Sequence, residues 1–95
     1  MKEISINDFP VRDLLEIDNK KIVVFDVIWP SNVFCFDLNG KLIWQIGKYG
    51  DKQQLFLNLS YNYALSKCVV FDAHNCRYTI NVDNGSLSEF ERLRY

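Results

Sequence analysis

Few residues in this chain have the type and spacing that catalysis needs. Its only histidine, His74, lies two positions before Cys76, and a thiolate–imidazole pair could act as a nucleophile with its base. Residues at positions i and i+2 of a strand share a face, but no third group orients this pair. We therefore expect no catalysis here, and interpret His74 as a turn residue beside a buried cysteine.

A metal site is the second chemistry to weigh. Structural zinc needs four ligands, and the chain has four candidates: His74, Cys35, Cys68 and Cys76. However, no CxxC-type spacing occurs. The twelve acidic residues show no spacing that marks a hydrolytic carboxylate pair, and there is no Gly-rich phosphate loop. The sequence therefore predicts no enzyme, no metal site and no cofactor.

Composition and charge narrow the class of protein. Ninety-five residues, 48% hydrophobic and 15% aromatic, suit one folded domain over residues 1–95. Eleven basic and twelve acidic residues give a net charge of −1, which argues against direct nucleic-acid binding. The first residues lack the apolar stretch of a signal peptide, and no apolar run approaches the roughly 20 residues of a membrane span. We expect a cytoplasmic protein with reduced, buried thiols and no membrane partner.

The elements that position these residues form two similar halves. Lys21–Asp26 recurs forty-six positions later as Lys67–Asp72, and Phe36–Leu42 corresponds to Ile80–Leu87 with one extra residue. A period of about 44–46 residues built from short strands is typical of propeller blades, each an antiparallel sheet of four strands. We predict an all-β fold of two antiparallel blade-like sheets that form a partial β-propeller. The two repeats are expected over about 9–46 and 55–95.

Strands are predicted where β-branched and aromatic residues stand between turn signals. Asn39-Gly40 predicts a type I′ hairpin turn, in which both central residues have positive φ. Residues 9–17 fit a short helix about as well as a strand, and a strand is preferred because each blade needs one there. Ser86–Glu89 has the form of a helix capping box, although the repeat favours a returning strand. The other expected strands span 22–28, 33–38, 42–46, 55–65, 68–73 and 77–82.

One segment of the first repeat, residues 32–44, resembles the repeat of quinoprotein- or WD-type β-propellers. It runs as a two-hydrophobe strand, Asp37, a turn with Gly40 and a strand ending in Trp44. The second repeat keeps the spacing around Gly85, but has Asn81 in place of the aspartate and Glu89-Phe90 in place of the tryptophan. Because complete propellers carry four or more blades, the resemblance implies a partial propeller or one completed by other chains.

Small proteins with two such halves and no catalytic residues are similar to immunity proteins of bacterial toxin–immunity systems, such as contact-dependent growth inhibition. This resemblance implies a stoichiometric inhibitor that binds a cognate toxin domain and blocks its active site, and that is a monomer or weak dimer when alone. The alternative is a carbohydrate-binding lectin in which three two-bladed chains complete a six-bladed ring. A third hypothesis is a subunit of a larger scaffold.

The residues expected to contact a partner are acidic or aromatic. An acidic edge would steer a basic partner, such as a nuclease toxin domain. Asp26 and Asp72 follow equivalent apolar strands, and each is either part of such an edge or an acceptor for turn amides. Trp29 is either an exposed anchor or locally packed, whereas Trp44 is expected in the core, and Tyr61 and Tyr63 are expected to be half-buried.

The acidic edge is read from the first eighteen residues, which carry a net charge of −3. Their charged side chains are Glu3, Asp8, Asp13, Glu16 and Asp18, against Lys2 and Arg12. Together with the aromatic candidates, the predicted partner-binding residues are Asp8, Asp26, Trp29, Asp51, Tyr61, Tyr63 and Asp72.

Overall fold

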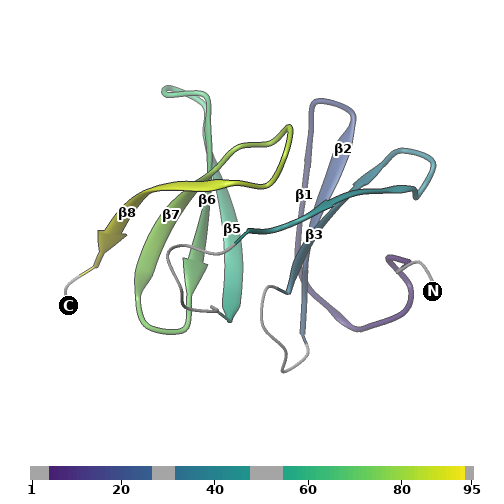
Figure 1. The fold of residues 1–95 in the computed structure, drawn as a ribbon, viewed down its shortest axis with the longest axis horizontal. Coiled ribbons are helices and arrows are strands. Elements are labelled where there is room, and N and C mark those ends of the chain that lie inside the picture. Colours follow the sequence, from purple (N-terminus) through teal and green to yellow (C-terminus); the bar gives the residue numbers. More distant parts are fainter. Residues whose placement is uncertain (1–4, 27–31, 48–54, 94–95) are drawn as a thin grey trace.

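The computed structural model describes residues 5–26, 32–47 and 55–93, which form two four-stranded antiparallel sheets (Figure 1). Each sheet is a simple meander, with strand order β1-β2-β3-β4 in the first and β5-β6-β7-β8 in the second. The predicted all-β fold, with one blade-like sheet for each repeat, is confirmed, and the two sheets do not close into a ring. The strands are β1 Val11–Ile17, β2 Lys20–Phe25, β3 Val33–Asp37, β4 Leu42–Gln45, β5 Phe56–Asn62, β6 Lys67–Asp72, β7 Cys76–Ile80 and β8 Leu87–Arg92.

Both ambiguous segments form strands. Residues 11–17 are β1, which pairs with β2, and the segment after Ser86 is β8, which pairs with β7. β8 contains a register shift at Glu89, whose φ is 51°, so that Ser88 pairs with Thr79 and Glu91 with Arg77. The capping-box pattern therefore produces no helix, because pairing with β7 satisfies the backbone of this segment.

The β3–β4 hairpin forms as predicted, but its turn is of another type. Gly40 has a φ of 85°, whereas Asn39 is not among the residues of positive φ, so the predicted type I′ turn is wrong. The Asp37 N–H donates to the Lys41 carbonyl at 2.9 Å, and the Gly40 N–H donates to the Asp37 carbonyl at 3.0 Å. This is a three-residue loop that ends in a left-handed residue, the next most common hairpin connection.

The two-residue loop lies instead between β1 and β2. Asp18 and Asn19 both have positive φ, at 51° and 60°, and the flanking residues Ile17 and Lys20 pair with each other. Aspartate and asparagine tolerate this left-handed conformation better than other side chains. β1 and β2 are therefore joined by these two residues alone.

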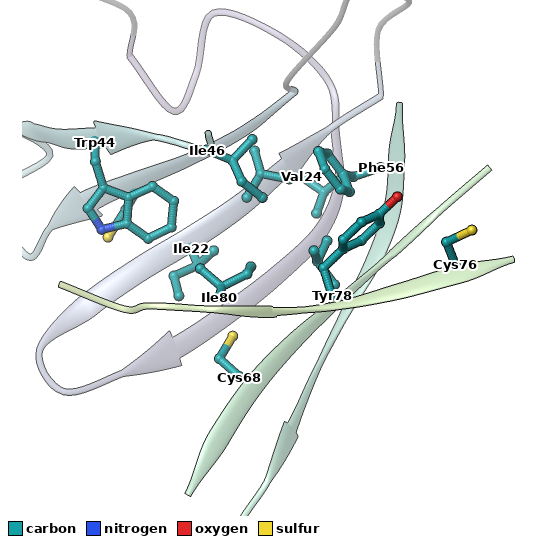
Figure 2. Packing of buried hydrophobic residues seen from close by; sticks show 12 residues of the cluster. Ile22, Val24, Trp44, Ile46, Phe56, Cys68, Cys76, Tyr78 and Ile80 are labelled. Atoms are coloured by element: carbon teal, nitrogen blue, oxygen red, sulfur yellow. The ribbon is translucent and has the colours of Figure 1, made fainter. Parts of the chain in front are cut away.

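The two sheets pack face to face, and alternate residues of β2, β3, β6 and β7 fill most of the space between them (Figure 2). Ile22 and Val24 of β2 correspond in the repeat to Cys68 and Val70 of β6, so the two halves contribute matching sides of one core. The buried cluster comprises Ile22, Val24, Val33, Cys35, Trp44, Ile46, Phe56, Cys68, Val70, Cys76, Tyr78 and Ile80.

The outer faces of the two sheets differ. The outer face of the first sheet is apolar, and the N-terminal segment covers it with Ile6 and Phe9. The ring of Phe9 meets that of Phe25 edge to face, with centroids 5.5 Å apart. The outer face of the second sheet carries charged and polar side chains, described below. The covered residues of the first sheet, all at most 2% exposed, are Val23, Phe25, Phe34 and Phe36.

A buried amide ties the two sheets together at one end of the core. Asn32 is 1% exposed, and its Nδ2 donates to the carbonyls of Phe25 and Phe56, at 2.8 and 2.9 Å. Its Oδ1 accepts the Phe56 N–H at 2.8 Å. Because buried polar groups need partners, these three bonds fix the end of β2 against the start of β5.

A buried indole ties the sheets together at the other side of the core. Trp44 is 7% exposed, which confirms its predicted core position, and its Nε1 donates to the Val82 carbonyl at 2.8 Å. The Gly47 N–H donates to the Gly85 carbonyl at 3.0 Å. The end of β4 is therefore bound to the β7–β8 turn.

Candidate functional site

The predicted contact residues lie at opposite ends of β5. Asp26 follows β2 at the end where Asn32 joins Phe25 to Phe56. Tyr61 and Tyr63 lie at or beyond the other end of that strand. With a rise of about 3.3 Å per residue, the six steps from Phe56 to Asn62 span roughly 20 Å. Asp26 and Tyr63 therefore do not belong to one compact surface.

Asp72 is a buried turn residue. Asp72 is only 4% exposed. Its Oδ1 accepts the N–H groups of His74 and Cys76, at 2.8 and 3.0 Å. Oδ2 accepts the Tyr78 hydroxyl at 2.8 Å, and burial together with this bond raises the pKa of Tyr78. A carboxylate enclosed in this way does not reach a partner, which contradicts the predicted contact role of Asp72 and supports its interpretation as an acceptor for turn amides.

The first repeat contains the same turn, but it begins at Asp37. Asp26, the residue that the repeat aligns with Asp72, does not form it. Asp37 Oδ1 accepts the N–H groups of Asn39 and Lys41, both at 2.9 Å. In each turn a left-handed residue follows the aspartate by three positions, Gly40 with φ 85° and Asn75 with φ 60°. The sequence signal that finds this turn is an aspartate followed three residues later by Gly or Asn.

The remaining predicted acids have different surroundings. The Asp26 side chain is 62% exposed, and its Oδ1 lies 3.5 Å from the Arg12 guanidinium. Asp8 is exposed, and its Oδ2 accepts the Ser5 N–H at 2.9 Å. Trp29 and Asp51 lie outside the described residues. Asp26 is therefore a surface acid that a cation already partly neutralises.

An exposed aromatic side chain lies at the tip of the β5–β6 hairpin. β5 ends at Asn62, earlier than predicted, so Tyr63 stands in the turn and is 83% exposed instead of half-buried. Its ring meets that of half-buried Tyr61 edge to face, with centroids 4.7 Å apart. Leu65 beside it is 62% exposed, and its N–H donates to Asn62 Oδ1 at 3.1 Å. The hairpin thus presents two apolar side chains in an ordered turn.

Acidic side chains lie at the same end of the molecule. β1 and β5 run side by side in one direction, since Arg12 Nε donates to the Leu57 carbonyl and the Leu59 N–H donates to Asp13 Oδ2. The β1–β2 turn with exposed Asp18 and the β5–β6 turn therefore project from the same end, as Figure 1 shows.

The ion pairs at this end are long. Lys20 Nζ lies 3.7 Å from Asp83 in the β7–β8 turn, and Lys21 Nζ lies 3.9 Å from Glu16. Exposed pairs of this kind contribute little to stability, so their carboxylates remain available to a partner. The sequence did not predict Asp83 and Leu65 as contact residues, because only the strand topology places the β5–β6 and β7–β8 turns at the same end as the β1–β2 turn. We call the set Glu16, Asp18, Tyr61, Tyr63, Leu65 and Asp83 the tip surface.

A groove of about 340 Å³ lies on the outer face of the second sheet. Lys67 Nζ lies 2.8 and 2.7 Å from the two carboxylate oxygens of Glu89, and this pairing lowers the pKa of Glu89. Arg77 pairs with Glu91 beside it. The groove is therefore lined by compensated charges. Its lining residues are Asn62, Leu65, Lys67, Val69, Arg77, Thr79, Glu89, Phe90 and Glu91.

His74 is exposed in the β6–β7 turn, whereas Cys35, Cys68 and Cys76 are all buried. Cys76 Sγ lies 3.7 Å from the His74 backbone carbonyl and bonds to it. Burial raises the pKa of Cys35 and of Cys68 to about 11, so these thiols stay protonated at neutral pH. Among the described residues, no three His, Cys, Asp or Glu side chains gather as metal ligands.

Comparison with known proteins shows no relative of this chain. No protein-family model matches the sequence, and a search of curated proteins gives no match either. Within the described ranges, no helix is long and apolar enough to cross a membrane.

Proposed function

We propose that this protein is a cytoplasmic immunity protein of the contact-dependent growth inhibition type, which binds a basic toxin domain and covers its active site. The observation that carries the proposal is the tip surface. It combines the ordered, exposed side chains of Tyr63 and Leu65 with the acidic side chains of Asp18 and Asp83. Exposed aromatic anchors provide binding energy, and complementary charge speeds encounter and fixes orientation.

The order of the hairpin favours binding by a rigid surface. The edge-to-face contact between Tyr61 and Tyr63 and the bond from Leu65 to Asn62 hold the tip in place. Less conformational freedom is then lost when a partner closes over these side chains. Acidic groups that occupy a nuclease cleft take the positions of substrate phosphates, so inhibition follows from charge as well as from steric exclusion.

The two outer faces favour a single chain over a closed ring. Ile6 and Phe9 cover the apolar outer face of the first sheet, and ion pairs cross the outer face of the second. The second face is polar, as the outer faces of terminal repeats in stacked proteins are. The first face is largely covered, and Val11 and Leu14 remain about half exposed at its edge. These features favour the inhibitor over the lectin alternative, in which three chains would complete the ring.

The proposal is tested by co-purifying the protein with the toxin domain encoded beside its gene. We expect a monomer in light scattering when the protein is alone, a 1:1 complex with the toxin, and complete loss of toxin activity at equimolar inhibitor. Asp18→Asn should slow association and weaken its salt dependence, whereas Asp26→Asn at the far end should have a smaller effect. A stable trimer, or a toxin that stays active in excess inhibitor, would contradict the proposal.

A further inference from the structure

We propose that the groove on the outer face of the second sheet binds a neutral polyhydroxylated ligand, namely one or two sugar units. The ligand would lie across β6, β7 and β8, centred on Lys67, Thr79 and Glu89. This site is centred on the sheet face and shares only Asn62 and Leu65 with the β5–β6 hairpin, and the proposal does not depend on the inhibitor function.

The polar groups of the groove are arranged for hydroxyl groups. Lys67 and Arg77 supply N–H donors, and Glu89 and Glu91 supply carboxylate acceptors, from three neighbouring strands. The Thr79 hydroxyl lies between them, 3.4 Å from a carboxylate oxygen of Glu89. A sugar hydroxyl both donates and accepts, so adjacent hydroxyls can bridge such alternating groups through charge-assisted bonds.

The charge balance of the groove disfavours ions. Each cation is paired with a carboxylate, Lys67 with Glu89 and Arg77 with Glu91. An anion that approaches either cation also meets a carboxylate, and a cation that approaches either carboxylate meets Lys67 or Arg77. A neutral ligand bonds to both members of a pair without separating them, so no net charge has to be desolvated.

The groove also has an apolar wall. Val69 and Leu65 line it, and Leu65 is 62% exposed, whereas the ring of Phe90 packs on Tyr78, with centroids 5.4 Å apart. Sugar rings have apolar C–H faces as well as hydroxyl edges, and small-molecule sites combine apolar walls with a few placed polar groups. The groove volume lies at the low end of the roughly 300–1,000 Å³ of such sites, which suits one or two sugar units.

The test is a titration of the isotope-labelled protein, followed by backbone amide shifts, with glucose, galactose, mannose, N-acetylglucosamine and maltose. We expect at least one sugar to give saturable shifts confined to β6–β8, with a Kd on the order of 1–10 mM because the groove is open to water. Thr79→Val, which removes a hydroxyl, and Glu89→Gln, which replaces a charge-assisted bond by a neutral one, should each weaken that binding about five-fold.

A control is Glu16→Gln, which removes a longer cross-strand ion pair from the first sheet and should leave the titration unchanged. Sodium sulfate and free arginine serve as ionic probes of the same amides. Larger shifts with either ion than with every sugar, or no saturable shift with any of the five sugars, would overturn the proposal.

Discussion

The indole of Trp44 lies directly against the α-carbon of Gly85. A Cβ atom built on Gly85 would lie 2.5 Å from Cε3 and 2.8 Å from Cδ2 of Trp44, and this glycine has a φ of 78°. Trp44 comes from the first repeat and Gly85 from the second, so the pair joins the two sheets where a side chain on residue 85 would keep them apart.

We therefore expect Gly85→Ala to destabilise the fold strongly. Left-handed backbone costs a non-glycine residue about 1–2 kcal/mol, and overpacking against the indole adds about 1–3 kcal/mol. Gly40→Ala is the matched control, because Gly40 has a similar φ of 85° and a Cβ there would meet no atom within 4 Å beyond its chain neighbours. Urea unfolding followed by tryptophan fluorescence compares the two variants, and equal losses would show that the indole contact contributes nothing.

Asn32 should be among the least replaceable polar residues of the described chain. Asn32→Ala leaves the Phe25 and Phe56 carbonyls and the Phe56 N–H without their buried partner. Each unsatisfied buried group costs about 1–3 kcal/mol, so we expect a loss of about 3 kcal/mol or more. Asn84→Ala removes one exposed bond to the Ser86 N–H and should cost about 1 kcal/mol or less in the same unfolding experiment.

Tyr63→Ala should separate binding from folding. Because Tyr63 is exposed, the free energy of unfolding should change by less than about 0.5 kcal/mol. Loss of a central aromatic anchor should weaken toxin binding by about 30-fold, measured by calorimetry. Leu38→Ala is a control on another hairpin, since Leu38 is 58% exposed in the β3–β4 turn. If both variants bind the toxin as the parent protein does, the tip surface is not the interface.

The buried thiols should make the protein less stable in alkali. Burial raises the pKa of Cys35 and Cys68 from 9.0 to about 11, so the folded state retains protons that the unfolded state releases. Their contribution is fully present below pH 9 and is lost as the pH rises toward about 11. Urea midpoints at pH 7 and pH 10 test this, with Cys35→Ala/Cys68→Ala as reference. A thiol reagent should label neither cysteine at pH 8 without denaturant, and rapid labelling would contradict their burial.

Much of the fold could be predicted because the repeat and the alternation of apolar residues report directly on strands and on core positions. Ile22 and Val24, with their counterparts Cys68 and Val70, are buried as the repeat implies. Turn chemistry was harder to predict. Asn39-Gly40 fits two loop types, and the choice depends on the Asp37 carboxylate, which accepts two turn amides.

The candidate site was less predictable because it depends on relations between strands. Asp26 and Asp72 occupy equivalent positions in the repeat, yet one is exposed beside Arg12 and the other is buried beneath Tyr78. The tip surface depends on β1 and β5 running side by side in the same direction, and nothing in the sequence of either strand predicts that arrangement. The groove depends on the pairing of β8 with β7, which a register shift at Glu89 sets.

The indole bond also has a consequence for synthesis on the ribosome. Each meander is built from neighbours in sequence, so the first four strands can pair as soon as they emerge. Trp44, however, finds its acceptor thirty-eight residues later, at Val82. Until translation passes that point, the nascent first sheet keeps its apolar inner face open, and this is the stage at which chaperones would engage the chain.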